Sequence, residues 1–425
     1  MVENVFVVGL NDHSAAILSR LPDADRYRFH RLLSSEELLF RDTIPLPDLL
    51  AEAQRRVEAF DGPVHAVIGF WDFPVSTMVA MLCQRLGLRW ASLESVAKCE
   101  HKYWSRLEQR RVIDEYPRFG LVDLDKPTLP EGLRYPVWVK PVKSVSSALA
   151  YRVEDRQQLR QAAADIREGI GRMGEPFDFV LSQLQLPPEV SGVGGLACLA
   201  EEEAGGAQVT IEGYSFQGEV YVYGTVDSIT CPDSSSFLRY QYPSSLPPAV
   251  TGRMAELSER VIHQIGLDGI TFNIEYFWDS AQDRITLLEV NPRHSQSHAE
   301  LFEHVDGIAN HDHMLQLALG REPRPRHREG PYDIAAKWFV RRVADGVVRR
   351  VPTAEEVEQV QRDITGCTVD VAVTAGDRLS ELWDQDSYSY ALATVYLGAH
   401  DEGELIRKYE HALAGLPFEF EEPTG

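Results

Sequence analysis

Cysteine is scarce in this chain, and long apolar runs are missing. Five cysteines occur among 425 residues, and they are scattered without a CxxC pair. This pattern predicts free thiols in a reducing compartment, not a disulfide framework or a zinc site. No apolar run reaches the roughly 20 residues that cross a bilayer. The opening MVENVFVVGL carries an acid where a signal peptide needs bases, so we expect a cytoplasmic protein without a membrane partner.

Basic charge is also in deficit. The chain has 65 Asp and Glu against 42 Lys and Arg, a formal net charge of −23. Such a charge argues against nucleic acid as a partner, although a local basic pocket for a nucleotide is compatible with it. Apolar content of 44% and charged content of 25% are ordinary for a globular protein. The length exceeds what one core accommodates, so two or three domains are expected.

Alternating strand and helix patterns open the chain. Strands are predicted at 5–10 and 64–70 and helices at 13–21 and 74–86, an order that indicates a parallel sheet. The glycine spacing of a dinucleotide fingerprint is absent from the first turn. The expected elements that follow are a helix at 92–111, strands at 137–141, 149–153 and 179–185, a helix at 155–172, a solvated acidic tract at 201–207, strands at 208–213 and 219–227, a loop at 234–248, a helix at 251–266 and a strand at 269–278. Beyond a basic linker at 323–330, the pattern predicts a β-rich region with two helices.

One stretch, ITLLEVNPRHSQSH at residues 285–298, carries polar groups at alternate positions. In a strand, Glu289, Asn291 and Arg293 would point to one face with neighbours about 6–7 Å apart. Two oxygen ligands followed by a guanidinium suit a magnesium-bound polyphosphate, and Glu275 lies on the strand expected beside them. The alternative is a solvated polar edge strand. The nearby histidines lack the spacing of a metal motif, so His294 is more plausible in orienting a polar substrate.

Two loops are candidate lids. Lys140 lies in the strand VWVKP, before the small-residue loop SVSSA at 144–148. This arrangement favours a phosphate contact beneath a closing loop; a surface lysine on a hairpin is the alternative. The loop at 234–248 is rich in serine, proline and aromatics and contains Arg239. It suits a substrate lid or, equally, a structural loop.

Several separated stretches together resemble the ATP-grasp superfamily, in particular its carboxylate–amine ligases related to biotin carboxylase and bacterial L-amino-acid ligases. Lys102, Lys140, PEVSG, TIEGYSFQGEV, FNIEYF, LLEVNPR and LALGREP follow one another in that family's order over roughly residues 90–325. The resemblance implies an α/β and α+β chain with three parts. These are an N-terminal parallel α/β domain at 1–95, a two-lobed ATP-grasp domain at 96–325 with a mobile lid at about 135–180, and a small β-rich cap at 326–425.

The resemblance also implies roles for individual residues. Lys102, Lys140 and Ser146 would contact ATP phosphates, and the backbone at Gln183 and Leu184 would contact the adenine. Glu189 would hold the ribose, with Glu212 as the second choice. Glu275, Glu289 and Asn291 would bind two Mg²⁺ ions, for which Mn²⁺ can substitute, and Arg293 would steady the transferred phosphoryl group. The substrate candidates come from position and not from the resemblance: Arg239 lies in the candidate lid loop, and His294, Ser295, Ser297 and His298 lie just past the metal-binding stretch. The sequence departs from the family in three places: Ser182-Gln183 stands where the hinge usually has Glu, the phosphate loop lacks glycine, and about twenty residues separate PEVSG from TIEGY.

The implied activity is ATP-dependent joining of a small carboxylate, such as an amino acid, to an amine through an acyl-phosphate, with release of ADP and phosphate. A bicarbonate-using carboxylase and a nucleotide-binding pseudo-enzyme scaffold are the alternatives. No biotin-attachment domain was found in the sequence, which disfavours the carboxylase. A homodimer is expected from the resemblance alone.

Overall fold

The structure is a computed structural model that describes residues 2–38, 43–144, 148–231, 236–382 and 389–421. The chain forms two compact units. Unit 1 comprises Met1–Tyr223, Leu246–Gln296 and His311–Arg324, and unit 2 comprises Gly224–Ser245, Ser297–Asn310 and Pro325–Gly425. Within the described ranges, no helix combines the length and the apolar character needed to cross a bilayer. The predicted mixture of a parallel N-terminal sheet with antiparallel sheets is confirmed.

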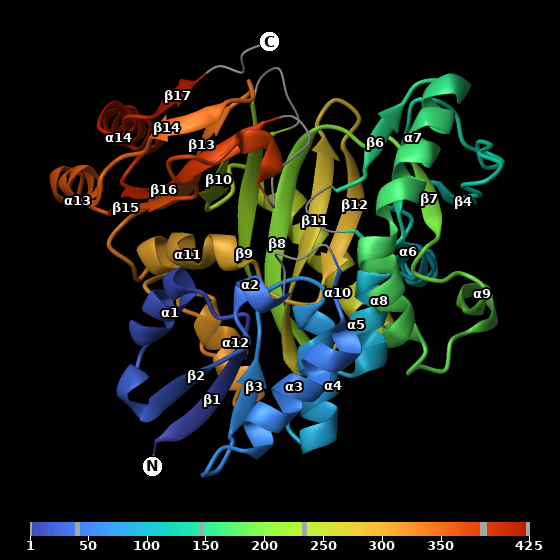
Figure 1. Cartoon of the computed structure of the whole chain (residues 1–425), viewed down its shortest axis with the longest axis horizontal. Coiled ribbons are helices and arrows are strands. Elements are labelled where there is room, and N and C mark those ends of the chain that lie inside the picture. Colours follow the sequence, from blue (N-terminus) through green and yellow to red (C-terminus); the bar gives the residue numbers. More distant parts are fainter. Residues whose placement is uncertain (1, 39–42, 145–147, 232–235, 383–388, 422–425) are drawn as a thin grey trace. The chain divides into compact units, whose positions relative to one another are not determined.

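A three-stranded parallel sheet begins unit 1, in the order β2-β1-β3. Its strands are β1 (Glu3–Val8), β2 (Tyr27–Leu32) and β3 (Ala66–Ile68), and the intervening helices are α1 (Asp12–Ser19), η1 (Ala24–Arg26), α2 (Ser35–Leu38) and α3 (Leu46–Glu58). Helix α4 (Val75–Leu86) follows β3 and is buried over its first nine residues. It ends at Gly87, whose φ of 67° is the left-handed conformation that glycine adopts without strain. Figure 1 shows α3 and α4 beside this sheet.

The prediction of one continuous helix at 92–111 is wrong, because the segment forms two helices that are separated at His101. Helix α5 (Leu93–Glu100) ends there and α6 (Lys102–Gln109) begins, with His101 in an extended conformation. The His101 ring accepts a hydrogen bond from the Trp104 N–H and so caps α6. The Lys102 N–H is thereby directed to the Val142 carbonyl, 2.9 Å away on the chain that follows β5. The break therefore fixes Lys102 at the start of a helix.

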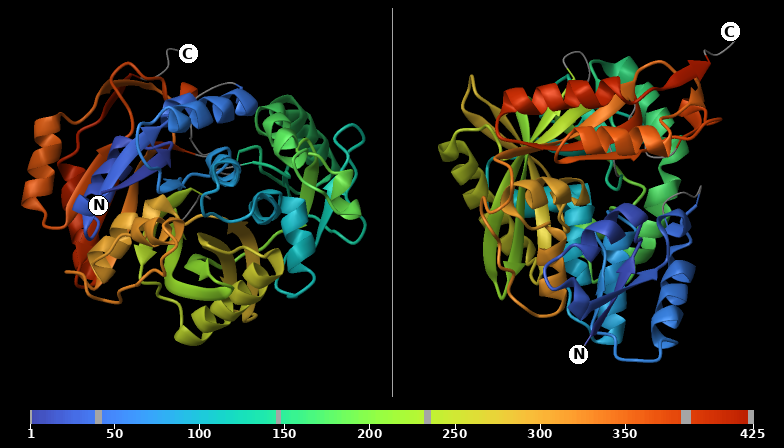
Figure 2. Two further views of the ribbon diagram at one scale, coloured as in Figure 1. Left: turned by 90° about the horizontal axis from the view of Figure 1, so that it is seen from below. Right: turned by 90° about the vertical axis from the view of Figure 1, so that its left-hand side faces the viewer.

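A second, antiparallel sheet of unit 1 has the order β4-β7-β5-β6. It consists of β4 (Phe119–Val122), β5 (Val137–Pro141), β6 (Tyr151–Val153) and β7 (Cys198–Glu202), and it is accompanied by α7 (Arg156–Gly169), α8 (Gly171–Leu181) and α9 (Pro188–Ser191). Figure 2 shows α7 and α8, in green, side by side. The strand predicted at 179–185 is wrong, because Phe177, Val180 and Leu181 bury one helical face of α8 at spacings of three and four.

The third sheet of unit 1 has the order β12-β11-β8-β9. Its strands are β8 (Ala207–Phe216), β9 (Glu219–Thr230), β11 (Ile270–Asp279) and β12 (Arg284–Asn291), with helices α10 (Pro248–Ile265) and α12 (His311–Ala318) in the same unit. The β11–β12 pairing is antiparallel and shifts by one residue between Glu275 and Tyr276. Glu275 faces Glu289 and Tyr276 faces Leu287, so Leu288 is the extra residue of a β-bulge.

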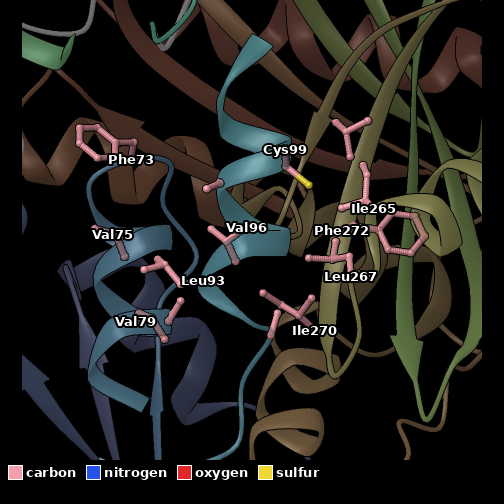
Figure 3. Packing of buried hydrophobic residues seen from close by; sticks show 14 of the residues in the cluster. Phe73, Val75, Val79, Leu93, Val96, Cys99, Ile265, Leu267, Ile270 and Phe272 are labelled. Carbon is pink, nitrogen blue, oxygen red and sulfur yellow. The ribbon is translucent and has the colours of Figure 1, made fainter. Parts of the chain in front are cut away.

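The main apolar core of unit 1 joins the N-terminal helices to this sheet. Figure 3 shows Val75 and Val79 of α4 and Val96 of α5 gathered with Ile270 and Phe272 of β11. These five side chains are all at most 1% exposed. Burying such side chains contributes about 1.5–3 kcal/mol each. The packing therefore holds α4, α5 and the carboxylate-bearing strands as one body.

Unit 2 contains the end of β9 and continues its sheet in the order β9-β10-β13-β16-β15. Its other strands are β10 (Phe237–Tyr242), β13 (Ile334–Arg342), β14 (Val347–Arg350), β15 (Cys367–Val371), β16 (Tyr390–Ala399) and β17 (Glu419–Glu421), and its helices are η2 (Gln296–His298), which starts in unit 1, α11 (Ala299–Asp306), α13 (Ala354–Asp363), η3 (Leu379–Glu381) and α14 (Glu402–Ala414). The predicted loop at 234–248 is wrong for 237–242. That segment is an inner strand, because β9 and β13 pair with it on either side.

Three histidines of unit 1 are buried and held neutral. His101, His311 and His313 are 0%, 1% and 3% exposed. Burial lowers the pKa of His101 to about 4 and that of His313 to about 4. Burial, with the charge of His13 as a smaller cause, lowers the pKa of His311 to about 3. In the unfolded chain such rings titrate near pH 6.5. Between pH 6.5 and about 4 the unfolded state therefore binds more protons than the folded state.

The free energy of unfolding is expected to fall as the pH drops through this window. Each histidine contributes about 1.4 kcal/mol per pH unit, so the three contribute about 4 kcal/mol per unit near pH 5. Denaturant unfolding at pH 5 and pH 6 measures this slope. His313→Gln should lower it by about 1.4 kcal/mol per unit, whereas His263→Gln, at an exposed position, should leave it unchanged. An unaltered slope in His313→Gln would contradict the prediction.

Candidate active site

One face of the β8-β11-β12 sheet is lined with polar side chains. Directly opposed residues of antiparallel strands share a face, and residues two apart on a strand share it too. Two cross-strand rows result from the register. The rows are Thr210, Glu275 and Glu289, and Glu212, Asn273 and Asn291. The opposite face carries Ile211, Ile274 and Val290, which are at most 1% exposed. The alternation thus separates a packed core from a polar surface on the same three strands.

Two carboxylates confront each other on the polar face. Glu275 accepts a hydrogen bond of 3.0 Å from Gln208, and Glu289 accepts one of 2.6 Å from the Lys102 ammonium. Burial, together with the charge of Glu289, raises the pKa of Glu275. Burial acts to raise the pKa of Glu289 as well, but Lys102 and the neighbouring lysines lower it overall. Opposed like charges are destabilising in a sheet, so this pair favours a bound cation.

The donor set fits magnesium. Asn291 lies on the same face as the two carboxylates and donates its amide N–H to Asn273 at 2.9 Å, so its amide oxygen can serve as a further ligand. Carboxylate and amide oxygens are hard ligands of the kind that Mg²⁺ takes. In the part of the chain that the structure describes, no cluster of three or more His, Cys, Asp or Glu side chains forms a metal site. The candidate ligands are therefore Glu275, Glu289 and the Asn291 amide oxygen.

Two lysines predicted from the sequence, the partly buried Lys102 and the buried Lys140, lie against acidic partners. Lys102 donates to Glu289 and, at 3.0 Å, to the Ser144 carbonyl at the edge of the predicted phosphate loop. Lys140 pairs with Glu201 at 2.7 Å. Both ammonium groups belong to side chains only 11% exposed. Lys140 is therefore not a surface lysine on a hairpin, which was the alternative prediction.

Glu201 was assigned from the sequence to a solvated tract, and that interpretation is wrong. The side chain is 2% exposed on β7 and accepts from both Arg106, at 2.6 Å, and Lys140. Burial acts to raise the pKa of Glu201, but Arg106 and Lys140 outweigh it and lower the pKa to about 2. Arg106 also donates to the Leu288 carbonyl at 2.6 Å, so one guanidinium links β7 to the bulge of β12. No local sequence pattern marks Glu201, because its partners lie far away in the chain.

A buried ion pair that was not predicted lies beside these residues. Lys143 donates to Glu100 at the end of α5, and Glu100 also accepts from Ser76 of α4. Lys143 and Glu100 are each no more than 6% exposed. Lys143 follows Lys140 by three residues in VWVKPVK, which is the one signal that the sequence offered. The pair connects the start of the predicted phosphate loop to two helices.

Arg293, the predicted catalytic residue, lies just beyond β12 and is held by an acid that was not predicted. Its Nε donates to Asp72 at 2.8 Å and its Nη2 at 2.7 Å, while Nη1 donates to the His294 carbonyl at 3.3 Å. Asp72 comes from the turn between β3 and α4. Ligands bind at the carboxyl ends of parallel strands. Because GFWDF at residues 69–73 follows the predicted strand of the parallel sheet, this rule could have identified Asp72 as a candidate site residue.

Comparison with known proteins decides the family of this segment. Residues 133–299 match the family model described as ATP-grasp domain. They form an ATP-grasp domain. The curated proteins gave no match, but solved structures did. L-amino acid ligase from Bacillus licheniformis has 17% identity and a TM-score of 0.69, with 99% of each chain covered.

Two further structures share the fold. Phosphoribosylglycinamide synthetase from Anaerococcus prevotii has 12% identity and a TM-score of 0.63, over 99% of this chain and 100% of that one. The biotin carboxylase domain of 2-oxoglutarate carboxylase from Hydrogenobacter thermophilus was solved with MgADP and bicarbonate. It has 14% identity and a TM-score of 0.62, over 99% and 91% of the two chains. At these identities the likeness establishes the fold, which agrees with the predicted ATP-grasp architecture.

Within the ATP-grasp domain, Glu212, His294 and Ser295 lie close to the polar face. Glu212 is fully buried and accepts from Tyr223 at 2.9 Å and from the Ser295 N–H at 3.0 Å. The His294 ring contacts Thr271 at 3.2 Å and His311 at 3.1 Å. The roles predicted for these three residues in binding ribose or substrate stay predictions.

Other predicted residues are placed elsewhere. Gln183 and Leu184 help to line a pocket of about 380 Å³ whose other walls come from α4, α5 and the segment between them. Glu189 is exposed on α9. None of the carboxylates, lysines or arginines described above lines that pocket. Ser146, predicted to contact phosphate, lies outside the described residues.

Three predicted substrate residues belong to unit 2. Arg239 pairs with Glu402 and lies over the Trp338 ring at 4.6 Å. Ser297 accepts from Lys337 at 3.0 Å, and the His298 ring packs edge-on against Tyr240. Their contact with a substrate stays a prediction.

Proposed function

We propose that this protein is an ATP-dependent ligase that joins a small carboxylate to an amine through an acyl-phosphate. ATP-grasp enzymes are ATP-dependent ligases, and the fold and family match support that class. The observation that carries the proposal is that Glu275 and Glu289 lie opposite each other on neighbouring strands, and that Lys102 donates a hydrogen bond to Glu289. Such an arrangement supplies both the metal ligands and the cations that a triphosphate needs.

In the proposed reaction each residue acts on charge or position. Glu275, Glu289 and Asn291 would hold two Mg²⁺ ions, which when bound neutralise the β- and γ-phosphates. Lys102 and Lys140 bind phosphate oxygens, which are natural partners for buried ammonium groups. Arg293 steadies the γ-phosphoryl group as it passes from ATP to the substrate carboxylate, with ADP as the leaving group. The catalytic effect of these groups comes from positioning and electrostatics.

Two bonds are exchanged in sequence. A carboxylate oxygen of the substrate attacks the γ-phosphorus, the bond to ADP breaks, and an acyl-phosphate forms. The amine nitrogen then attacks the acyl carbon and loses a proton. The bond between the acyl carbon and the phosphate oxygen breaks, and phosphate leaves with its electron pair. Because acyl-phosphates react with water, the site must exclude it during this interval. The loops at 144–148 and 234–248 were predicted to do so, and both include residues outside the described ranges.

For the base of the nucleotide we propose the end of β7 in place of Gln183 and Leu184. The segment at 203–206 connects β7, which pairs with the Lys140 strand, to β8, which pairs with the Glu275 strand. We therefore propose that its backbone contacts the adenine. For the ribose we propose Glu212 in place of Glu189, the first choice from the sequence, because Glu212 lies directly opposite Asn273 on β8 whereas Glu189 is exposed on a separate helix.

An ADP-release screen tests the proposed function. Purified protein is given MgATP, a panel of carboxylates and a panel of amines, and the products are identified by mass spectrometry. The expected result is ADP release that requires both a carboxylate and an amine, with an amide product, and none from Glu289→Gln. ADP release that needs only bicarbonate would identify a carboxylase instead. Nucleotide binding without ADP release would indicate a scaffold.

A further inference from the structure

Asp72 occupies one edge of the Arg293 guanidinium and leaves another edge open to a ligand. The two hydrogen bonds from Nε and Nη2 take the side-on edge. On the other edge, formed by Nη1 and Nη2, the described residues contribute only the His294 carbonyl, at 3.3 Å from Nη1. The Asp72 side chain is 32% exposed and that of Arg293 12%. A carboxylate accepts up to about four hydrogen bonds, so Asp72 retains capacity beyond its two contacts with Arg293.

The position of Asp72 is fixed by the fold. It lies in the turn at the carboxyl end of β3, the edge of a parallel sheet where ligands bind. The preceding Trp71 donates its indole N–H to the Gly9 carbonyl at 2.9 Å, beyond the end of β1. The Asp72 carbonyl accepts the Val75 N–H at 2.9 Å, at the start of α4. These two hydrogen bonds tie the turn to β1 on one side and to α4 on the other, so the Asp72 carboxylate is carried on a rigid support.

The charges around Arg293 call for a ligand that carries both signs. Asp72, Glu212 and Glu100 all act electrostatically on this guanidinium. Glu275 lies close enough for Asp72 to act on it as well. A plain carboxylate that approaches Arg293 therefore meets several anions. A ligand whose own cation adjoins its carboxylate would instead gain from Asp72 what it loses to repulsion.

We propose that Asp72 recognises the α-ammonium group of an amino-acid substrate whose carboxylate lies at the open edge of Arg293. The two charged groups of an α-amino acid are separated by a single carbon, which suits the adjacent poles of one ion pair. This inference rests on the proposed function, because it names the substrate class of the same site. It assigns Asp72 to discrimination between amino acids and simple carboxylic acids, a choice made by a charged hydrogen bond that only one of them forms.

The test uses substrate pairs that differ only in the ammonium group. L-Alanine is compared with propionate, L-leucine with 4-methylpentanoate, L-phenylalanine with 3-phenylpropanoate and L-glutamate with glutarate. For each pair, kcat/KM for ADP release is measured in the wild type and in Asp72→Asn, which keeps the side-chain size and an acceptor for Arg293. Loss of a hydrogen bond to a charged group should lower kcat/KM for the accepted amino acid about 10- to 150-fold. The value for its des-amino partner should change less than about 3-fold.

A matched control and a second readout separate the outcomes. Glu3→Gln removes the acidic partner of Arg321 within the same unit and should leave the substrate preference unchanged. Equal losses for both members of a pair in Asp72→Asn would overturn the proposal, because Asp72 would then only position Arg293. The absence of any amino-acid preference in the wild type would overturn it too.

Saturation-transfer NMR of the same compounds, with MgADP present, measures binding without turnover. An amino-acid preference in binding that is lost in Asp72→Asn, together with no ADP release from any compound, would support recognition by Asp72 and refute the ligase. ADP release without any preference for amino acids would support the ligase and refute recognition by Asp72. If the protein neither turns over nor binds any of the compounds, both proposals are overturned.

Discussion

Replacement of Glu275 by glutamine is expected to abolish ADP release while making the metal-free protein more stable. The variant removes one of two confronted carboxylates. Activity should fall by about 10³-fold or more, because the loss of a metal ligand removes several kcal/mol of charge stabilisation. The free energy of unfolding at pH 8 without metal should rise by about 1 kcal/mol, because like charges opposed in a sheet repel each other.

Thermal and denaturant unfolding, with and without MgATP, measure both parts of this prediction. The wild type should gain stability from MgATP, since a ligand that binds only the folded state stabilises it, and Glu275→Gln should gain little. Glu259→Gln, at an exposed position on α10, is the control and should behave as the wild type does. Retained turnover in Glu275→Gln would remove Glu275 from the site. A metal-free variant less stable than the wild type would show that the carboxylate is structural.

Replacement of Glu201 by glutamine is expected to cost about 3–5 kcal/mol of stability, the usual cost of leaving a buried charge without its partner. Here two cations, Lys140 and Arg106, lose their shared acid. Urea unfolding measures the loss. Glu202→Gln is a matched control from the next position of β7. Its partner Arg118 is largely exposed, so removing that pair should cost at most about 1 kcal/mol. Equal costs for the two variants would contradict the assignment of Glu201 as the buried counter-ion.

The pKa of Glu201 gives this prediction a pH dependence. Its folded pKa, about 2, is below the ordinary value of 4.5. The contribution of Glu201 to stability is therefore fully present above pH 4.5 and is lost as the pH falls toward 2. The difference in unfolding free energy between wild type and Glu201→Gln should accordingly shrink across that range.

What the sequence could predict was set by local repetition. Alternation in LLEVNPR placed Glu289 and Asn291 on one strand face, Glu275 of FNIEYF was predicted on the neighbouring strand, and the structure puts these three on one face of the sheet. Residues 74–86 form enough helical turns, and Gly87 follows directly, to identify α4. The family order of the motifs then predicted the ATP-grasp fold.

What could not be predicted depends on contacts between distant residues. Asp72 meets Arg293 across more than two hundred residues, and Glu201 meets Arg106 across ninety-five. A short apolar run such as FVLSQLQ fits a strand or a helix equally, and only the partners of Phe177 and Val180 decide between them. The break at His101 likewise depends on Val142, which receives the Lys102 N–H.

The bulge at Leu288 has a consequence for anyone who would transplant this site. In an uninterrupted ladder, residues 287 and 289 would share a face, so Leu287 could not enter the core while Glu289 left it. Continuing the Tyr276–Leu287 register would set Leu288, not Glu289, opposite Glu275. A designed hairpin that copies the letters of β11 and β12 onto a regular template would therefore scatter the ligands. The inserted residue Leu288 has to be copied with them, together with Arg106, which donates a hydrogen bond to the Leu288 carbonyl.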